Sequence, residues 1–388
     1  MSQARLLVWV LALIATAGYG ALYYAQPLLA VATEHATGWS RAHTSLAFTL
    51  ALLTNAALAP LAGRWLDQWG GQVLISGGAL LGAGALTALS VTHSYPVFVV
   101  SWLLIGAAMT LTFYEAVFTV LGQQQQGPDR VRATLTVTLI AGLASTIFVP
   151  RTTAFLGVGG LPLALRGLAG TLLVVAVLGW VVLPSGGHPR TRTVLAPFRP
   201  DQTFLRLTVV FTLARIASVG VGLQLAPLFL SSGAAPTVAA ALAGAMGLAS
   251  LPGRMLFVPL QRRLGLRTLI CGLLLNLPGH GIGAVVGVMA FGLANGALTL
   301  ARTELLMERY LAARFGTVNG RMALPVNLAQ ALTPFAVGLI FTWTGSYRPS
   351  LLLSCALALG ATWLLWPENR GRKTINLDSQ AITDLKNG

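Results

Sequence analysis

Residues 96–118 read PVFVVSWLLIGAAMTLTFYEAVF and contain one charged side chain, Glu115. As an α-helix, a stretch of this length rises about 34 Å, enough to cross the roughly 30 Å hydrocarbon core of a membrane. A carboxylate at that depth is costly unless a partner or a wet cavity receives it. The stretch therefore predicts a membrane-spanning helix, and it raises the question of what Glu115 faces.

The composition of the whole chain is that of a polytopic helical membrane protein. Of its 388 residues, 55% are hydrophobic and 9% are charged, and the mean hydropathy is +0.75. A soluble domain carries about 25% charged residues, so water is not the solvent for most of this surface. Most of the 43 glycines occur within apolar runs, as in GGALLGAG at 77–84, and predict close helix–helix packing.

The net charge of +15 does not indicate a nucleic-acid partner, because the basic residues occur singly in short loops. They follow the positive-inside rule of membrane proteins instead. Cys271 and Cys355 lie in apolar runs and predict neither a disulfide framework nor a metal site. The sequence contains no phosphate-binding loop and no cofactor motif. We therefore expect no cofactor and no ATP-driven transport within this chain.

Twelve apolar runs are expected to span the bilayer. The ninth is the weakest, because it contains Asn276, Pro278 and His280. Removing it would place the last basic clusters on the wrong side of the membrane. We therefore expect both termini in the cytoplasm of a bacterial cell, with the chain in its plasma (inner) membrane. The runs are 6–30, 42–63, 73–91, 96–121, 133–156, 163–183, 204–230, 236–260, 266–280, 282–304, 321–343 and 349–366.

The longest polar interruption, PSGGHPRTRTVLAPFRPDQT at 184–203, predicts a cytoplasmic linker between two halves. It would separate a six-helix bundle at 1–183 from a second bundle at 204–366, followed by a polar cytoplasmic tail at 367–388.

The two halves repeat one another weakly but in order. GALYYAQPLL at 20–29 matches GVGLQLAPLF at 220–229, and LDQWG at 66–70 aligns with QRRLG at 261–265. The third match places LTFYE, which ends at Glu115, over LTLAR, which ends at Arg302. Two parallel six-helix repeats are typical of transporters with a binding site near the membrane midplane.

With this repeat, GRWLDQWGGQ at 63–72 resembles the loop between helices two and three of the major facilitator superfamily. Gly63, Asp67 and Gly70 match the family pattern, whereas Gln68, Gly71 and Gln72 replace residues that are usually basic. The resemblance implies an all-α fold of twelve membrane-spanning helices in two pseudo-symmetric bundles. It also implies that this motif, which includes Arg64, takes part in gating. Its Asp would cap a neighbouring helix and pair with a cation, for which Arg130, Arg132 and the start of the eleventh span near Arg321 are the candidates.

Two branches of the family compete. The run at 38–70, beginning GWSRAHTSLAF, resembles bacterial transporters of monocarboxylates and of oxalate and formate. In contrast, YYAQPLL at 23–29 resembles transporters that export drugs and metabolites.

Charge within the spans favours an anionic substrate. Intramembrane ionisable residues usually face a wet path, and a guanidinium binds a carboxylate through two parallel hydrogen bonds. The resemblance to the monocarboxylate branch assigns the substrate carboxylate to Arg254. The four intramembrane arginines are Arg151, Arg215, Arg254 and Arg302, against the acids Glu115 and Glu304.

We expect Glu115 to pair with Arg302 or with Arg254 across the central path. Protonation of Glu115 would release the arginine for a substrate anion and so couple the proton to transport. A permanent salt bridge that only fixes helix packing remains the alternative for Glu115. Tyr23, Tyr24, Gln26 and Tyr114 are further candidates for substrate contacts, or for packing.

The resulting prediction is a monomeric, proton-coupled secondary transporter of a small, monocarboxylate-like organic anion. The alternative is a proton-coupled antiporter that exports drugs or sugars. An enzyme is not expected, since no nucleophile and base occur at an interpretable spacing.

Overall fold

The computed structural model describes residues 3–185, 198–231, 245–246, 248–255, 282–310, 314–346 and 348–365. Within these ranges the chain is helical, with no β-strand. Residues 248–255 form a helical segment of the second half. The remaining helices are α1 (Gln3–Tyr19), the π-helix η1 (Gly20–Tyr24), α2 (Gln26–Thr37), α3 (Arg41–Trp69), α4 (Gly71–Leu89), α5 (Tyr95–Thr112), α6 (Tyr114–Gln124), α7 (Gly127–Ala141), α8 (Ala144–Val182), α9 (Gln202–Ser231), α11 (Ile282–Arg309), α12 (Phe315–Thr344) and α13 (Arg348–Leu365).

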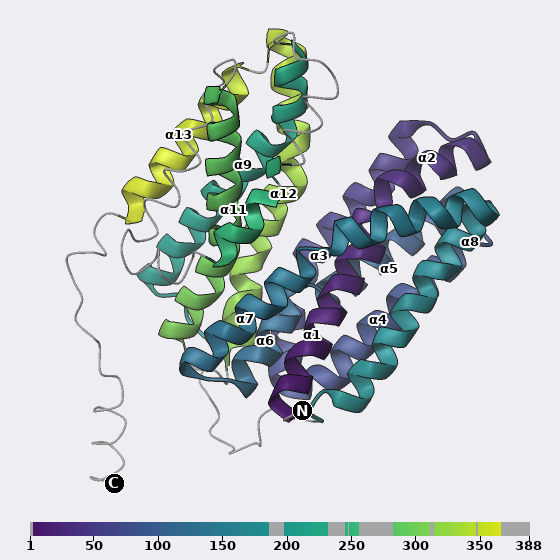
Figure 1. Cartoon of the computed structure of the whole chain (residues 1–388), viewed down its shortest axis with the longest axis horizontal. Coiled ribbons are helices and arrows are strands. Elements are labelled where there is room, and N and C mark those ends of the chain that lie inside the picture. The colour runs from purple at the N-terminus through teal and green to yellow at the C-terminus, as the bar shows by residue number, and fades with distance from the viewer. Residues whose placement is uncertain are drawn as a thin grey trace.

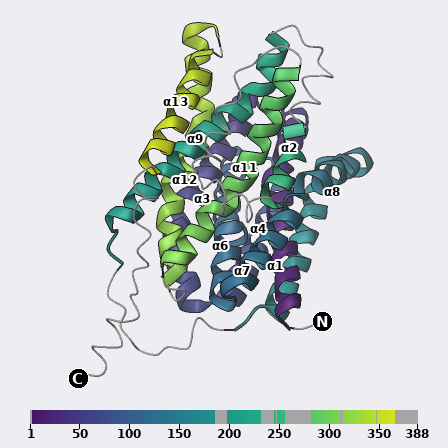
Figure 2. The ribbon, with the colours of Figure 1, turned by 60° about the vertical axis from the view of Figure 1, so that its left-hand side comes forward.

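The helices form two groups that lie side by side, α1 to α8 in one and α9 to α13 in the other (Figures 1 and 2). Eight helical stretches of the described chain are long and apolar enough to span a membrane. One of them, Gly127–Val182, reverses direction at Gly159 and Gly160, where the backbone leaves the helical region. The expected polytopic all-helical fold is confirmed. The expected ninth span at 266–280, most of the linker and the tail lie outside the described residues.

Several crossings are not continuous helices, contrary to the sequence prediction. The first crossing consists of α1, η1 and α2. The fourth is interrupted at Phe113, whose backbone is extended (φ −82°, ψ −177°) between α5 and α6. Non-helical backbone at membrane depth is tolerated where it is buried in protein or borders a cavity, and π-helical turns are frequent at functional sites.

The two halves meet closely at one end of the bundle. We call this the Gly70 end, because the α3–α4 turn lies there together with the starts of α1 and α12. A Cβ on Gly63 of α3 would lie 2.0 Å from the Gly316 carbonyl oxygen of α12, and one on Gly320 would lie 2.3 Å from the Ala59 oxygen. The two backbones therefore touch, and only glycine fits at these positions. Toward the opposite end, α2 and α9 diverge (Figure 1).

Candidate functional site

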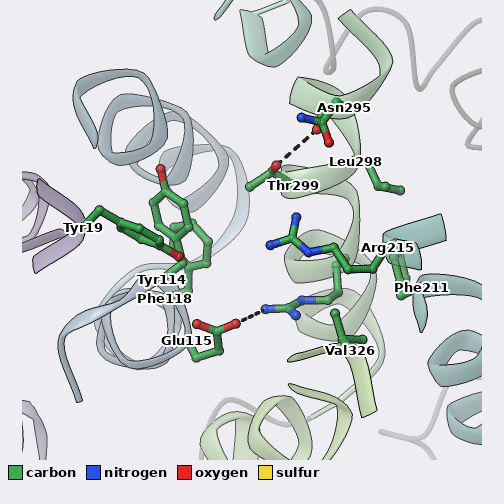
Figure 3. A pocket seen from close by; sticks show the side chains of 11 residues that line it. Tyr19, Tyr114, Glu115, Phe118, Phe211, Arg215, Asn295, Leu298, Thr299 and Val326 are labelled. Atoms are coloured by element: carbon green, nitrogen blue, oxygen red, sulfur yellow. Dashed lines mark hydrogen bonds and ion pairs between the residues drawn. The ribbon is translucent and has the colours of Figure 1, made fainter. Parts of the chain in front are cut away.

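A cavity of about 60 Å³ lies between the two halves. One water needs about 10–15 Å³ on this measure, so the cavity has room for a few water molecules or one small solute. Figure 3 shows the aromatic rings and Glu115 on one side, facing Arg215, Asn295 and Thr299 on the other. The lining residues are Tyr19, Tyr114, Glu115, Phe118, Phe211, Arg215, Asn295, Leu298, Thr299, Arg302 and Val326.

Glu115 and Arg302 form an ion pair across the cavity, as the repeat predicted. Arg302 Nη2 on α11 donates to Glu115 Oε1 on α6 over 3.0 Å. The side chains are only 12% and 17% exposed, respectively. The break at Phe113 places Glu115 in the first turn of α6, where the partial positive charge of a helix N-terminus favours an anion. The carboxylate is therefore held by its own half and by the other half.

Arg215 brings a second positive charge to the cavity. Its Nε donates to Gln330 Oε1 on α12 over 3.0 Å, and its Nη2 donates to the same oxygen. Gln330 is neutral, and among the described residues no carboxylate forms an ion pair with Arg215. Since Glu115 neutralises Arg302, the charged lining residues leave a net charge of +1.

The opposing wall of the cavity is aromatic. The rings of Tyr19 and Phe113 stack with centroids 3.9 Å apart, and those of Tyr114 and Phe118 stack at 5.0 Å. Tyr19 also lies 4.7 Å from Tyr114. The π-helical turn and the α5–α6 break thus meet at one cluster of rings beside Glu115.

The remaining predicted substrate residues lie outside this lining. Arg254 donates to the Thr138 carbonyl of α7 and interacts with the Tyr114 hydroxyl, so it joins the two halves beside the cavity. Arg151 is exposed on α8, with its guanidinium 5.3 Å from the Phe155 ring centroid.

The three candidates of the first crossing are not among the cavity-lining residues, although the Tyr24 ring lies 6.3 Å from that of Tyr19. The Tyr23 ring packs 5.7 Å from Phe48 and 5.3 Å from Tyr24, and the Tyr24 side chain is exposed. Gln26 is half-buried in the first turn of α2 and is not among the cavity-lining residues.

Asp67 closes the Gly70 end by capping α12, as the family resemblance implied. Its Oδ1 accepts from the Gly316 amide over 3.0 Å, and its Oδ2 accepts from the amide and the hydroxyl of Thr317 over 2.7 and 2.8 Å. Gly70 adopts φ +80°, a conformation that favours glycine and turns the chain into α4. Arg64 is exposed beside this contact.

The prediction of a basic partner for Asp67 is wrong. Gln123 of α6 donates to Asp67 Oδ1 over 3.1 Å instead. Arg130 is paired with Glu304 at 3.6 Å, and Arg132 lies 3.9 Å from Asp129 on the exposed side of α7. The Arg130–Glu304 contact is a second ion pair between the halves, with the opposite polarity to Glu115–Arg302. Arg321 donates to the Phe198 carbonyl rather than to Asp67.

Sequence reasoning missed several residues of the cavity. Tyr19, rather than Tyr23 or Tyr24, lines the cavity; it is the last residue of α1, and the other two lie in the π-helical turn that follows. Gln330, which accepts from Arg215, lies within an apolar helix, and so does the lining residue Thr299. Only the polarity of these two side chains could have indicated from sequence that they lie at a site. Asn295 also lines the cavity, and its Oδ1 accepts from the Ser218 hydroxyl.

Residues 8–279 match the family model of the Major Facilitator Superfamily. The chain belongs to this superfamily. No curated protein matches its sequence. The superfamily membership makes it a multi-pass membrane transporter and not an enzyme, in agreement with the broad prediction from sequence.

Solved structures of other transporters share the fold. The human organic anion transporter MFSD10 (TETRAN) has a TM-score of 0.76 at 15% identity, covering 94% of this chain and all of its own. A bacterial homologue of the iron transporter ferroportin, in an outward-facing state with soaked iron, has a TM-score of 0.75 at 16% identity, covering 95% and 99%. The proton:xylose symporter XylE has a TM-score of 0.71 at 13% identity, covering 93% and 95%. These likenesses establish the fold and do not select a substrate.

Proposed function

We propose that this transporter moves a small organic anion of the monocarboxylate type together with a proton, by alternating access. The observation that carries the proposal is Arg215. It lines the cavity, it is hydrogen-bonded to a neutral amide, and it has no carboxylate partner among the described residues. Arg215 is half-buried, and a charge partly removed from water attracts a counter-charge more strongly than one in bulk water. A substrate carboxylate would supply the missing negative charge.

The lining suits the two ends of such a substrate. The planar guanidinium of Arg215 presents parallel donors to a carboxylate, and Asn295 and Thr299 lie on the same wall. The rings of Tyr19 and Phe118 offer an apolar surface to a short carbon chain. A volume of about 60 Å³ corresponds to roughly four to six water-sized positions.

Proton coupling would act through the Glu115–Arg302 pair. Protonation of Glu115 removes its charge, which frees Arg302 and raises the positive charge facing the substrate. The anion and the proton would then enter the occluded state together. Static packing by a permanent salt bridge is the competing interpretation of the same contact.

Export of drugs or sugars by proton antiport is the second candidate, and the segment YYAQPLL at 23–29 favours it. One structural neighbour is described as an organic anion transporter and another as a proton:xylose symporter. At this low sequence identity, neither substrate can be assigned to this chain by similarity. The net positive cavity disfavours a lipophilic cation. The proposal further places a monomer in a bacterial plasma membrane, with the Gly70 end toward the cytoplasm.

Uptake into proteoliposomes with an imposed pH gradient tests the proposal, with lactate, pyruvate and larger carboxylates compared against xylose and a cationic dye. Arg215→Gln should raise the KM for the transported carboxylate at least tenfold. The matched control is Arg151→Gln, which removes an exposed arginine of another span and should leave KM unchanged. Unchanged carboxylate uptake by Arg215→Gln, or uptake of the dye alone, would refute the anion site.

A further inference from the structure

A second, smaller cavity lies between Glu115 and the closed Gly70 end. It encloses about 10 Å³ and is bordered by Gly63, Thr110, Thr119, Gly316 and Asn319, from α3, α5, α6 and α12. Glu115 lines both this cavity and the larger one. It is therefore the residue at which the two spaces meet.

Asn319 carries an unsatisfied polar atom at this cavity. The residue is 1% exposed, and its amide nitrogen donates to the Glu115 carbonyl over 3.3 Å. Among the described residues its Oδ1 has no hydrogen-bond partner. A buried amide oxygen without a partner costs about 1–3 kcal/mol, and an ordered water is the usual solution at such a place.

The size and lining of the small cavity fit one water molecule. A single water needs about 10–15 Å³ and two to four polar partners. Asn319 Oδ1 would accept one hydrogen bond from it. The hydroxyls of Thr110 and Thr119 already donate to backbone carbonyls, and their oxygens keep lone pairs for a further donor.

We propose that this cavity holds one water that carries protons between Glu115 and the Gly70 end, separately from the substrate. The Glu115 O–H bond breaks, its proton joins the water oxygen, and a proton of that water passes to solvent on the Gly70 side. Glu115 is left as a carboxylate paired with Arg302. The cavity is bordered by Gly63 and Gly316, which form the contact that closes this end, so separation of α3 from α12 would flood it first.

The ionisable groups around Glu115 fit this route. Arg302 of α11 and Arg215 of α9 face it across the large cavity, with Tyr19 of α1 and the adjacent Tyr114. On the other side, Asp67 of α3 is already bound to the amides of α12. The substrate side is therefore positively charged and repels a free proton, whereas the residues that line the small cavity are neutral apart from Glu115 itself. The role of this water in proton transfer rests on the proposed proton coupling. The presence of a water in the cavity does not depend on that proposal.

Two variants of α12 test the route. Asn319→Leu removes the amide and fills the cavity, and Asn327→Leu is the matched control, a buried asparagine on the same helix that borders neither cavity. The first measurement is hydrogen–deuterium exchange of the Glu115 carboxyl at a pH low enough to protonate it, followed by infrared spectroscopy in detergent without substrate and assigned with Glu115→Gln. Asn319→Leu should slow the exchange at least tenfold, with Asn327→Leu within twofold of the wild type.

Transport provides the second measurement. Proton-driven accumulation should fall at least tenfold in Asn319→Leu, while counterflow exchange, which also shows that the variant is folded, stays within twofold. Asn319→Ser keeps an oxygen and should retain most of the accumulation. Wild-type deuterium exchange in Asn319→Leu would overturn the water route, as would equal losses in the serine and leucine variants. If no carboxylate is transported at all, the proposed function fails while the infrared measurement still decides on the water.

Discussion

Removing the charge of Glu115 should destabilise the protein strongly, because it leaves Arg302 buried beside Arg215 without a counter-charge. At the 3.0 Å separation of Arg302 Nη2 and Glu115 Oε1, Coulomb attraction amounts to about 5 kcal/mol with an effective dielectric constant of about 20. Breaking a buried pair by deleting one partner usually costs about 3–5 kcal/mol. The side chains are 12% and 17% exposed, so solvent screens this interaction only weakly.

A double-mutant cycle isolates the pair. The free energy of unfolding in mixed SDS–detergent micelles would be measured for Glu115→Gln, Arg302→Gln and the double variant. We expect Glu115→Gln to lose about 3–5 kcal/mol and the double variant to lose less than the sum of the single changes. The difference should be at least about 2 kcal/mol, within the range of directly contacting residues.

The control is Arg132→Gln. Arg132 and Asp129 lie 3.9 Å apart, but their side chains are 83% and 82% exposed. Such surface pairs usually contribute little, so no measurable loss is expected. Additive effects of Glu115→Gln and Arg302→Gln, within about 0.5 kcal/mol, would show that the pair does not hold the halves together, and the electrostatic reasoning would fail.

Three further predictions concern the Gly70 end. Gly320→Val should force α12 away from the Ala59 carbonyl, which lies 2.3 Å from the position of a Cβ, and so raise the labelling rate of cysteines introduced at that end. Asp67→Ala removes the cap of α12 and should cost about 1–2 kcal/mol of stability with the same rise in labelling. Burial, and then the hydrogen bond to Asp201, raise the pKa of the Tyr310 hydroxyl above its ordinary value of 10.0. Since the folded state then holds this proton more tightly, the free energy of unfolding should fall as the pH rises above about 10. In thermal unfolding measured over a series of pH values, Tyr310→Phe should show a smaller fall in stability than the wild type.

The central ion pair could be predicted because two independent signals agreed. The repeat aligned LTFYE with LTLAR, and the opposite charges at their ends, Glu115 and Arg302, required partners in hydrocarbon. The structure contains this pair. The contact of Asp67 with the start of α12 followed from the motif at 63–72 in the same way.

Features that depend on helix phase could not be predicted. Tyr23 and Tyr24 were candidates because they offer rings and hydroxyl groups, and a period of 3.6 residues does not reveal the π-helical turn in which they lie. The partner of Asp67 depends on where α6 ends, and this brings Gln123 rather than Arg130 to the carboxylate. Arg254 was assigned by the resemblance to the monocarboxylate branch and by its depth, and neither specifies whether a side chain faces the cavity or the neighbouring half.

The break at Phe113 gives the ion pair an asymmetry that bears on coupling. Glu115 is stabilised by the N-terminus of α6, which contributes about 0.3–1 kcal/mol and rarely more than about 2. The attraction to Arg302 is larger, about 5 kcal/mol at 3.0 Å. Separation of the halves would retain the first interaction and lose the second, so both charges would be poorly compensated. Protonation of Glu115 together with binding of an anion to Arg302 would remove the cost of separating the two charges. Either event alone would leave one of the two side chains charged and without a counter-charge. Under the proposed function, the empty and unprotonated carrier therefore stays closed at the Gly70 end, and the leak of uncoupled protons is suppressed by the same pair that binds the two halves.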